Sequence, residues 1–73
     1  MGGQLPIKNR VKSLREAHNL SQGELGERVG VTRQTVAAIE QRRYSPSLET
    51  AFRIAREFNQ DFEQVFSWDE AVK

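Results

Sequence analysis

Four residues near the middle of the chain carry side chains that could read the edges of DNA bases. Arg33, Gln34 and Thr35 are consecutive, and Ala38 follows about one helical turn later. A guanidinium can bind guanine O6 and N7, a carboxamide can bind adenine N6 and N7, and alanine can contact a thymine methyl. These four residues are therefore candidates for direct base recognition.

The candidate base readers must lie on the exposed face of a helix to act together. If Val36 marks the inward direction, Ile39 and Glu40 also point inward at about 100° per residue. The outward positions are Gln34, Ala37, Ala38 and Gln41. Thr32 can act as the N-cap, so the pattern predicts a helix over Arg33–Gln41. An isolated polar face with alanines would be an ordinary solvated surface, so the interpretation depends on what precedes this helix.

A second helix is predicted immediately before it, over Gln22–Val29. The sequence Ser-Gln-Gly-Glu at residues 21–24 is a capping box, in which the serine and glutamate side chains each accept a free backbone N–H. Gly30 can end this helix in the left-handed conformation. Two helices joined by so short a turn form a helix-turn-helix, which places its second helix in the major groove. The predicted recognition unit is residues 21–41.

Two glycines lie inside the predicted Gln22–Val29 helix. Each costs about 1 kcal/mol of helix stability relative to alanine. Gly26 is expected to face the crossing of the two helices, where only a small side chain fits. Gly23 has no such explanation.

One acid and one base are predicted to form an ion pair inside the domain. Arg15 and Glu40 each fall on the apolar face of their own helix, and a buried charge requires a partner. Removing one member would cost about 3–5 kcal/mol because the other charge would be stranded. The expected role is to orient the recognition helix, not to catalyse a reaction.

The remaining pattern is helical and predicts one all-α domain of five helices over residues 1–73. The first helix is expected over Asn9–His18. The fourth is expected to be capped by Ser47 and to run to Phe58, and the fifth to run from the Asp61 capping pattern through Phe66. Residues 67–73 are predicted to be a polar tail.

Composition argues against an enzyme, a metal site and a cofactor. The chain has no cysteine, and its single histidine, His18, is placed to interact with the C-terminal dipole of the first helix. No apolar run approaches the roughly 20 residues that cross a bilayer, and residues 1–4 lack the blocks of a signal peptide. The sequence therefore predicts a cytoplasmic module with no membrane contact.

Charge is unevenly distributed along the chain. Residues 1–46 hold eight Lys/Arg against four acids, a net charge of +4, whereas residues 47–73 hold three bases against six acids, a net charge of −3. This asymmetry suggests a basic face for a polyanion and an acidic face turned elsewhere, although taken alone it is better explained by a mixed solvated surface.

The central sequence closely resembles the helix-turn-helix of the Xre family of phage-repressor-like regulators. The resemblance is carried by residues 21–40, SQGELGERVGVTRQTVAAIE, and continues through YSPSL at 44–48 and VFSW at 65–68. Over residues 7–68 the chain is similar to the short stand-alone members typified by the cytolysin operon repressor. The resemblance implies a five-helix repressor fold that binds double-stranded operator DNA as a homodimer.

The resemblance also implies roles for individual residues. It places base reading at Gln22, Arg33, Gln34, Thr35 and Ala38. It places phosphate contacts at or near Arg10, Thr32, Gln41 and Arg43. Arg42, where the chain departs from the family, is predicted as an additional phosphate contact. It assigns the dimer to a segment at about residues 58–70, through Phe62, Val65, Phe66 and Trp68, although these side chains could instead fill the core. The chain ends, Leu5–Lys8 and Phe66–Trp68, could pair as a small two-stranded sheet.

The chain departs from the family pattern just after Glu40. Family members commonly have Asn-Gly there, whereas this chain has Gln41 and Arg42. Arg42 is therefore expected to take a left-handed conformation that costs a non-glycine residue about 1 kcal/mol or more.

These observations favour a repressor that binds a pseudo-palindromic operator with its third helix in the major groove. The alternative is an antitoxin or adaptor whose main partner is another protein. An adaptor has no need for Arg33 and Gln34 on the outer face of that helix beside Gln22, so this face separates the two functions.

Overall fold

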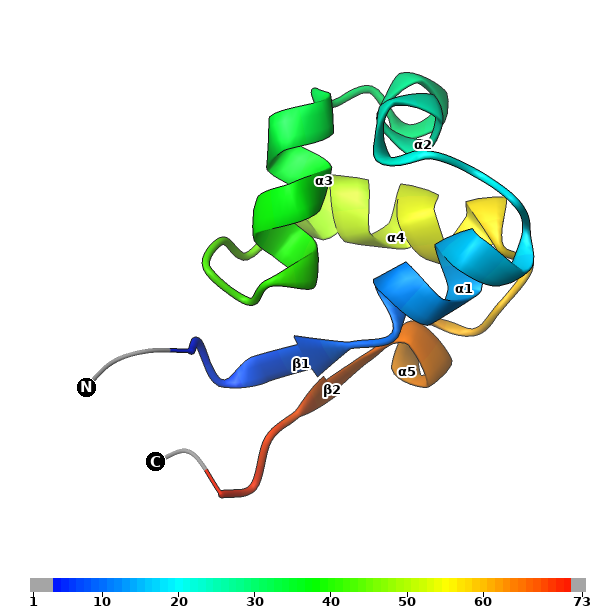
Figure 1. Ribbon diagram of the computed structural model, residues 1–73. Coiled ribbons are helices and arrows are strands. Elements are labelled where there is room, and N and C mark those ends of the chain that lie inside the picture. The colour runs from blue at the N-terminus through cyan, green and yellow to red at the C-terminus, as the bar shows by residue number, and fades with distance from the viewer. Residues whose placement is uncertain (1–3, 72–73) are drawn as a thin grey trace.

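The computed structural model describes residues 4–71, which form five helices and a pair of short strands (Figure 1). In chain order the elements are β1 (Ile7–Asn9), α1 (Val11–Ala17), α2 (Gln22–Val29), α3 (Arg33–Glu40), α4 (Leu48–Glu57), α5 (Phe62–Val65) and β2 (Phe66–Trp68). The predicted five-helix class and the pairing of the chain ends are both confirmed. Residues 1–3 and 72–73 of the predicted single domain lie outside the described residues.

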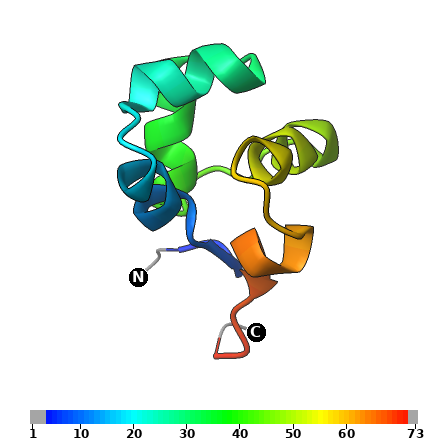
Figure 2. The ribbon, with the colours of Figure 1, turned by 90° about the vertical axis from the view of Figure 1, so that its right-hand side faces the viewer.

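The helices surround one apolar core. Figure 2 shows α1, α2 and α3 on one side of the molecule and α4 and α5 on the other. Every helix contributes to the cluster between them. Its largest fully buried side chains are Val11, Leu25, Val36, Ile39, Ile54, Phe58 and Val65.

Short polar side chains fix where three of the helices begin. Ser21, Thr32 and Ser47 each accept the backbone N–H of the residue three positions later, at 3.0–3.1 Å. Such caps satisfy one of the four N–H groups that a helix leaves free at its start. The starts predicted for α2, α3 and α4 are therefore correct, because capping is a local property of the sequence.

The prediction for the first helix was wrong at its start. The helix begins at Val11, not Asn9, because Asn9 belongs to β1 and pairs with Phe66. The two strands are antiparallel, with Ile7 opposite Trp68 and Lys8 opposite Ser67. The N-terminal strand thus covers residues 7–9 and not the expected 5–8.

The ends of the helices also differ slightly from prediction. α1, α3, α4 and α5 each end one residue before the expected last residue. Phe66, expected to end the fifth helix, has extended backbone and starts β2. Arg42 has a φ of +59°, which is the left-handed conformation expected from its place in the sequence. None of the described helices is both long enough and apolar enough to cross a membrane.

Candidate nucleic-acid interface

The turn between α2 and α3 requires glycine at position 26. A Cβ added to Gly26 would lie 2.5 Å from the Val31 carbonyl oxygen, far inside contact distance. The Gly26 carbonyl oxygen accepts the N–H groups of both Gly30 and Val31, at 2.8 and 2.9 Å. Gly30 has a φ of +86°, so it ends α2 in the left-handed conformation. Gly26 therefore packs against the backbone of the turn that joins α2 to α3, where no side chain fits.

Gly23 is different, because nothing fills the space beside it. A Cβ there would meet only the Ser21 hydroxyl oxygen, at 3.9 Å. We have no physical account of this glycine.

The N-terminal end of α3 is exposed and ordered by two threonines. Thr32 Oγ1 accepts the Thr35 N–H at 3.1 Å, and the two hydroxyl oxygens lie 3.0 Å apart. Thr32 is exposed, whereas Thr35 is half-buried. Both side chains therefore act first as the cap of α3.

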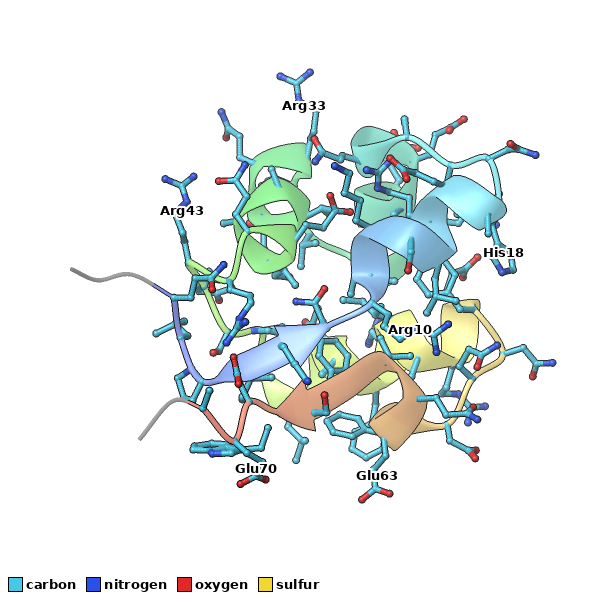
Figure 3. The ribbon with its side chains drawn as sticks, turned by 60° about the horizontal axis from the view of Figure 1, so that its bottom comes forward. Arg10, His18, Arg33, Arg43, Glu63 and Glu70 are labelled. Atoms are coloured by element: carbon cyan, nitrogen blue, oxygen red, sulfur yellow. The ribbon has the colours of Figure 1, made fainter. Side chains whose placement is uncertain are left out.

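The first two residues of α3 present their polar groups to solvent. Arg33 and Gln34 are both exposed, and Ala38 is half-buried one turn later. In Figure 3 the Arg33 side chain extends away from the molecule at one end of α3, and Arg43 extends outward beyond the other end. This is the geometry that base reading from a helix face requires.

A buried carboxylate holds α3 in place. Arg15 Nε donates to Glu40 Oε2 at 2.7 Å, and Arg15 Nη2 donates to Glu40 Oε1 at 3.2 Å. Only 11% of the Arg15 side chain and 4% of the Glu40 side chain are exposed. The hydrogen bond to Glu40 raises the pKa of Arg15 above its ordinary value. The ion pair expected from the sequence therefore joins α1 to α3.

Gln22 contributes to the same polar cluster. Its Nε2 donates to Glu40 Oε1 at 3.1 Å, which ties the first residue of α2 to the last residue of α3. Gln22 is half-buried, so its carboxamide orientation is set inside the protein. The structure thus places Gln22 beside α3 but commits its amide nitrogen to Glu40.

Arg10, expected near phosphate, is exposed and bonds to α5. Its Nη1 donates to the Gln64 carbonyl oxygen at 3.2 Å, and its backbone N–H donates to the Val65 carbonyl oxygen at 2.9 Å. Figure 3 shows it between α1 and α5, well away from Arg33. The contact with α5 therefore separates Arg10 from the other expected phosphate contacts.

Arg42 is also turned inward. Its Nε and Nη2 donate to the Leu5 carbonyl oxygen at 3.2 and 2.6 Å, and Nη2 donates to Asp69 Oδ2 at 3.0 Å. Only 14% of its side chain is exposed. The pKa of Asp69 is lowered, chiefly because its carboxylate accepts the Ala71 N–H and also because it accepts from Arg42. The Nε and Nη2 atoms of Arg42 thus donate to acceptors within the chain, whereas the side chains of Gln41 and Arg43 remain exposed.

Asn9 and Tyr44 were not among the site residues predicted from the sequence. Asn9 Nδ2 donates to the Ile39 carbonyl oxygen at 3.0 Å, and Asn9 Oδ1 accepts the Val11 N–H at 3.0 Å. An asparagine two residues before a helix is a recognisable capping signal, but its reach to α3 has no sequence signature. Tyr44 follows Arg43 and is 50% exposed, and only the structure shows how far its ring stands out.

The four residues expected at a dimer interface separate into two pairs. Val65 and Phe66 are buried, with 1% and 4% exposure, so they belong to the core of a single chain. Phe62 is half-buried and Trp68 is 55% exposed. The burial of Val65 and Phe66 follows from packing between α5 and the rest of the core, which leaves them little surface to offer a second molecule.

An apolar groove of about 540 Å³ lies beside Phe62 and Trp68. Its walls come from β1, α4, α5 and β2, and Leu48 at its edge is 67% exposed. The apolar side chains that line it are Ile7, Pro46, Leu48, Ala51, Phe62, Phe66 and Trp68.

Two exposed arginines beside α3 lie far from two exposed acids of the C-terminal segment. In Figure 3 Arg33 and Arg43 lie on the side of α3, while Glu63 and Glu70 lie at the opposite edge, near α5 and β2. This distribution agrees with the asymmetry found in the sequence. Within residues 4–71, no three histidine or acidic side chains are grouped so that they could hold a metal ion.

Comparison with known proteins places this geometry in context. Residues 11–65 match a family model described as helix-turn-helix. An HTH-type transcriptional regulator of Bacillus subtilis is 53% identical over 64 residues, covering 88% of this chain and 97% of that protein. A second such regulator, from Methanocaldococcus jannaschii, is 44% identical over 64 residues with the same two coverages. Both are described as uncharacterized.

A solved structure shows the same arrangement of helices. The crystal structure of the restriction-modification controller protein C.AhdI from Aeromonas hydrophila has a TM-score of 0.68 and 26% sequence identity to this chain. The match covers 74% of this chain and 78% of that one.

Proposed function

The chain belongs to the helix-turn-helix family of DNA-binding transcriptional regulators, and from this premise we propose that it represses transcription by binding a pseudo-palindromic operator as a homodimer. The observation that carries the proposal is the exposed start of α3, where Arg33 and Gln34 face solvent on a helix anchored from within. A rigid helix with free donors at its N-terminal end suits the major groove.

Base reading is assigned to the outer face of α3. Arg33 supplies a fork of donors for guanine, Gln34 pairs with adenine, and Ala38 offers a methyl to thymine. Thr35 and Gln22 act at the same edge, but each is already bonded inside the protein, through Thr32 and Glu40 respectively. Their main contribution is therefore to hold Arg33, Gln34 and Ala38 in position.

Phosphate contacts are assigned to the two ends of α3. Thr32 stands at its start, and Gln41 and Arg43 stand after its end, all three exposed. The free N–H groups at a helix start also favour a phosphate. Arg10 and Arg42 are not part of this set, because their guanidiniums are bonded to other parts of the chain.

A second copy of the chain is the proposed occupant of the apolar groove. Leu48 and Trp68 stand exposed at its edges, and burying such side chains stabilises association. A two-fold dimer would set its recognition helices about 34 Å apart, one turn of B-DNA.

A domain this small leaves little surface to recruit polymerase, which favours repression by occupancy of the operator. We propose that it binds this DNA in the cytoplasm.

Selection from a random duplex pool tests the proposal. We expect enrichment of a two-fold symmetric sequence, whose affinity falls by orders of magnitude between about 50 and 200 mM salt if about 6–10 phosphates are contacted. Arg43→Ala should reduce the salt slope by about 1, whereas Arg56→Ala, an equal change of charge on α4, should not. Failure to enrich any duplex would refute the function.

The groove also gives a specific reason for the alternative, an antitoxin or adaptor. A partner protein could bury Leu48 and Trp68 as well as a second copy could. This alternative predicts a monomer in solution, a flat salt dependence and no duplex enrichment, so the same selection separates the two functions.

A further inference from the structure

We propose that Arg42, Asp69 and Asn9 form a latch that fixes the C-terminal end of α3 to the strand pair and thereby sets the operator half-site spacing that the dimer accepts. The inference rests on the proposed function and names a determinant of its specificity. All three are positioning residues, because they act on α3 without touching DNA.

The first part of the latch joins the chain after α3 to the chain before β1. The Leu5 N–H donates to the Arg42 carbonyl oxygen at 3.0 Å. The Arg42 guanidinium in turn donates to the Leu5 carbonyl oxygen through Nε and Nη2. Residues 5 and 42 thus bind each other in both directions, and Figure 1 shows the lower end of α3 facing the strand pair.

The second part extends this bond to the other strand. Arg42 Nη2 also donates to the carboxylate of Asp69, the residue after β2, at 3.0 Å. The Asp69 N–H donates to the Pro6 carbonyl oxygen at 2.7 Å, and Asp69 Oδ1 accepts the Ala71 N–H at 3.0 Å. The aspartate is therefore bonded to Arg42, to the Pro6 carbonyl oxygen and to the Ala71 N–H, which links the chain after α3 to the flanks of both strands.

The third part acts directly on the helix. Asn9 Nδ2 in β1 donates to the Ile39 carbonyl oxygen at 3.0 Å. The last carbonyl groups of a helix have no partner within it. The Ile39 carbonyl oxygen also accepts the Arg42 N–H at 3.0 Å, so Asn9 adds a second donor to it. The Leu5 N–H donates to the carbonyl oxygen of Arg42, two residues after α3, so β1 and its flank are bonded to the end of α3 and to the turn that follows it.

The same strands border the apolar groove. Ile7, Phe66 and Trp68 line it, so the elements that would meet a second copy are those to which α3 is bonded. The angle between α3 and the strand pair then fixes the distance between the two recognition helices of a dimer. Without the latch, α3 is tied to the strands only indirectly, through the Glu40 bonds to α1 and α2, the chain connections and apolar packing, and we expect this arrangement to permit small rotations.

Arg42→Gly is the variant best suited to the test. It removes the guanidinium and relieves the left-handed backbone, φ +59°, which glycine adopts without penalty, so the fold is retained. Asp69→Asn removes one charge of the latch at constant size. Glu49→Gln is the matched control, because Glu49 forms an exposed ion pair with Arg53 within α4.

The experiment measures binding to operators whose selected half-sites are separated by spacers of different length. Each base pair rotates the second half-site by about 35°, so wild type should prefer one spacer by at least about tenfold over its neighbours. Arg42→Gly and Asp69→Asn should reduce that preference to within about threefold, with the half-site sequence unchanged. Glu49→Gln should match wild type.

Three results would overturn the latch. The preference for one spacer could survive in Arg42→Gly, or affinity could fall equally at every spacing, as a general loss of stability would cause. A salt slope reduced by about 1 in Arg42→Gly would instead show a phosphate contact. If wild type enriches no duplex at all, the proposed function fails and this inference fails with it.

Hydrogen exchange of the Leu5 backbone amide tests the latch without DNA. The Leu5 amide is bonded to the Arg42 carbonyl oxygen, so it should exchange more slowly in wild type and Glu49→Gln than in Arg42→Gly. Equal exchange rates in all three proteins would also overturn the proposal.

Discussion

Arg33 is the residue on which sequence specificity depends most in the proposed complex. We expect Arg33→Ala to weaken specific binding by about 1–3 kcal/mol and to relax selection at one base pair per half-site, because a forked contact to guanine is lost. Competition binding with every base substituted at each operator position measures both effects. Arg56→Ala serves as the charge control, and unchanged selectivity in Arg33→Ala would contradict the assignment.

The two glycines of α2 should respond oppositely to alanine. In Gly26→Ala the new methyl would meet the Val31 carbonyl oxygen at 2.5 Å, so the backbone must shift and the free energy of unfolding should fall by about 1–3 kcal/mol. Gly23→Ala adds a methyl in open space and should raise the free energy of unfolding by up to about 1 kcal/mol. Urea denaturation of both variants measures these changes, and equal shifts would contradict the close crossing.

At the scale of elements, the capping box of α2 makes stability depend on pH. Glu24 Oε1 accepts the Ser21 N–H at 2.8 Å, which is the main cause that lowers the pKa of Glu24 below its ordinary value of 4.5. The unfolded chain therefore takes up this proton at a higher pH than the folded chain does. The stabilisation is complete above the ordinary pKa and is lost as the pH falls through the lower, folded value.

We expect Glu24→Gln to lose less stability than wild type between about pH 5 and pH 3, since a carboxamide oxygen can still accept the Ser21 N–H but does not titrate. Denaturation midpoints measured across this range test the prediction. Glu27→Gln, on the same helix, keeps the capping box and should follow wild type. A wild-type acid dependence in Glu24→Gln would rule out this carboxylate as its source.

Hydrogen bonds from two neighbouring helices hold α3 in place. One carboxylate, that of Glu40, receives Arg15 from α1 and Gln22 from α2, so the recognition helix is bonded to both helices before it. Because 4% of the Glu40 side chain is exposed, water cannot replace these partners. The helix that presents Arg33 is thus held rigidly by hydrogen bonds on its inner side.

At the scale of the whole molecule, the proposed dimer depends on the exposed walls of the groove. Leu48→Glu and Trp68→Glu place charges on side chains that are 67% and 55% exposed, so each chain should remain folded while self-association is lost. Sedimentation should then report a monomer. Ala17→Glu, which adds the same charge at the exposed end of α1, should leave the dimer intact. A dimer that persists in both groove variants would move the interface elsewhere.

Much of the fold could be predicted because its signals are local. The capping residues Ser21, Thr32 and Ser47 bond to residues three positions away, and helical periodicity repeats within one turn. The closeness of α2 and α3 was also visible, since Gly26 has a cost that only tight packing explains. The Arg15–Glu40 pair could be inferred across 25 residues because two opposite charges on apolar faces each require a partner.

Only the tertiary structure showed which partners Arg10 and Arg42 bond to and that Val65 is buried. The sequence determined that a helix-turn-helix exists and which face of α3 is outward, because periodicity fixes direction. It did not determine where a long flexible side chain would find its acceptor. Arg42 bonds to residues 37 and 27 positions away, and Arg10 to one 54 positions away. Such partners are set only once the chain ends meet, because packing decides which carbonyl or carboxylate oxygen lies within reach of each guanidinium.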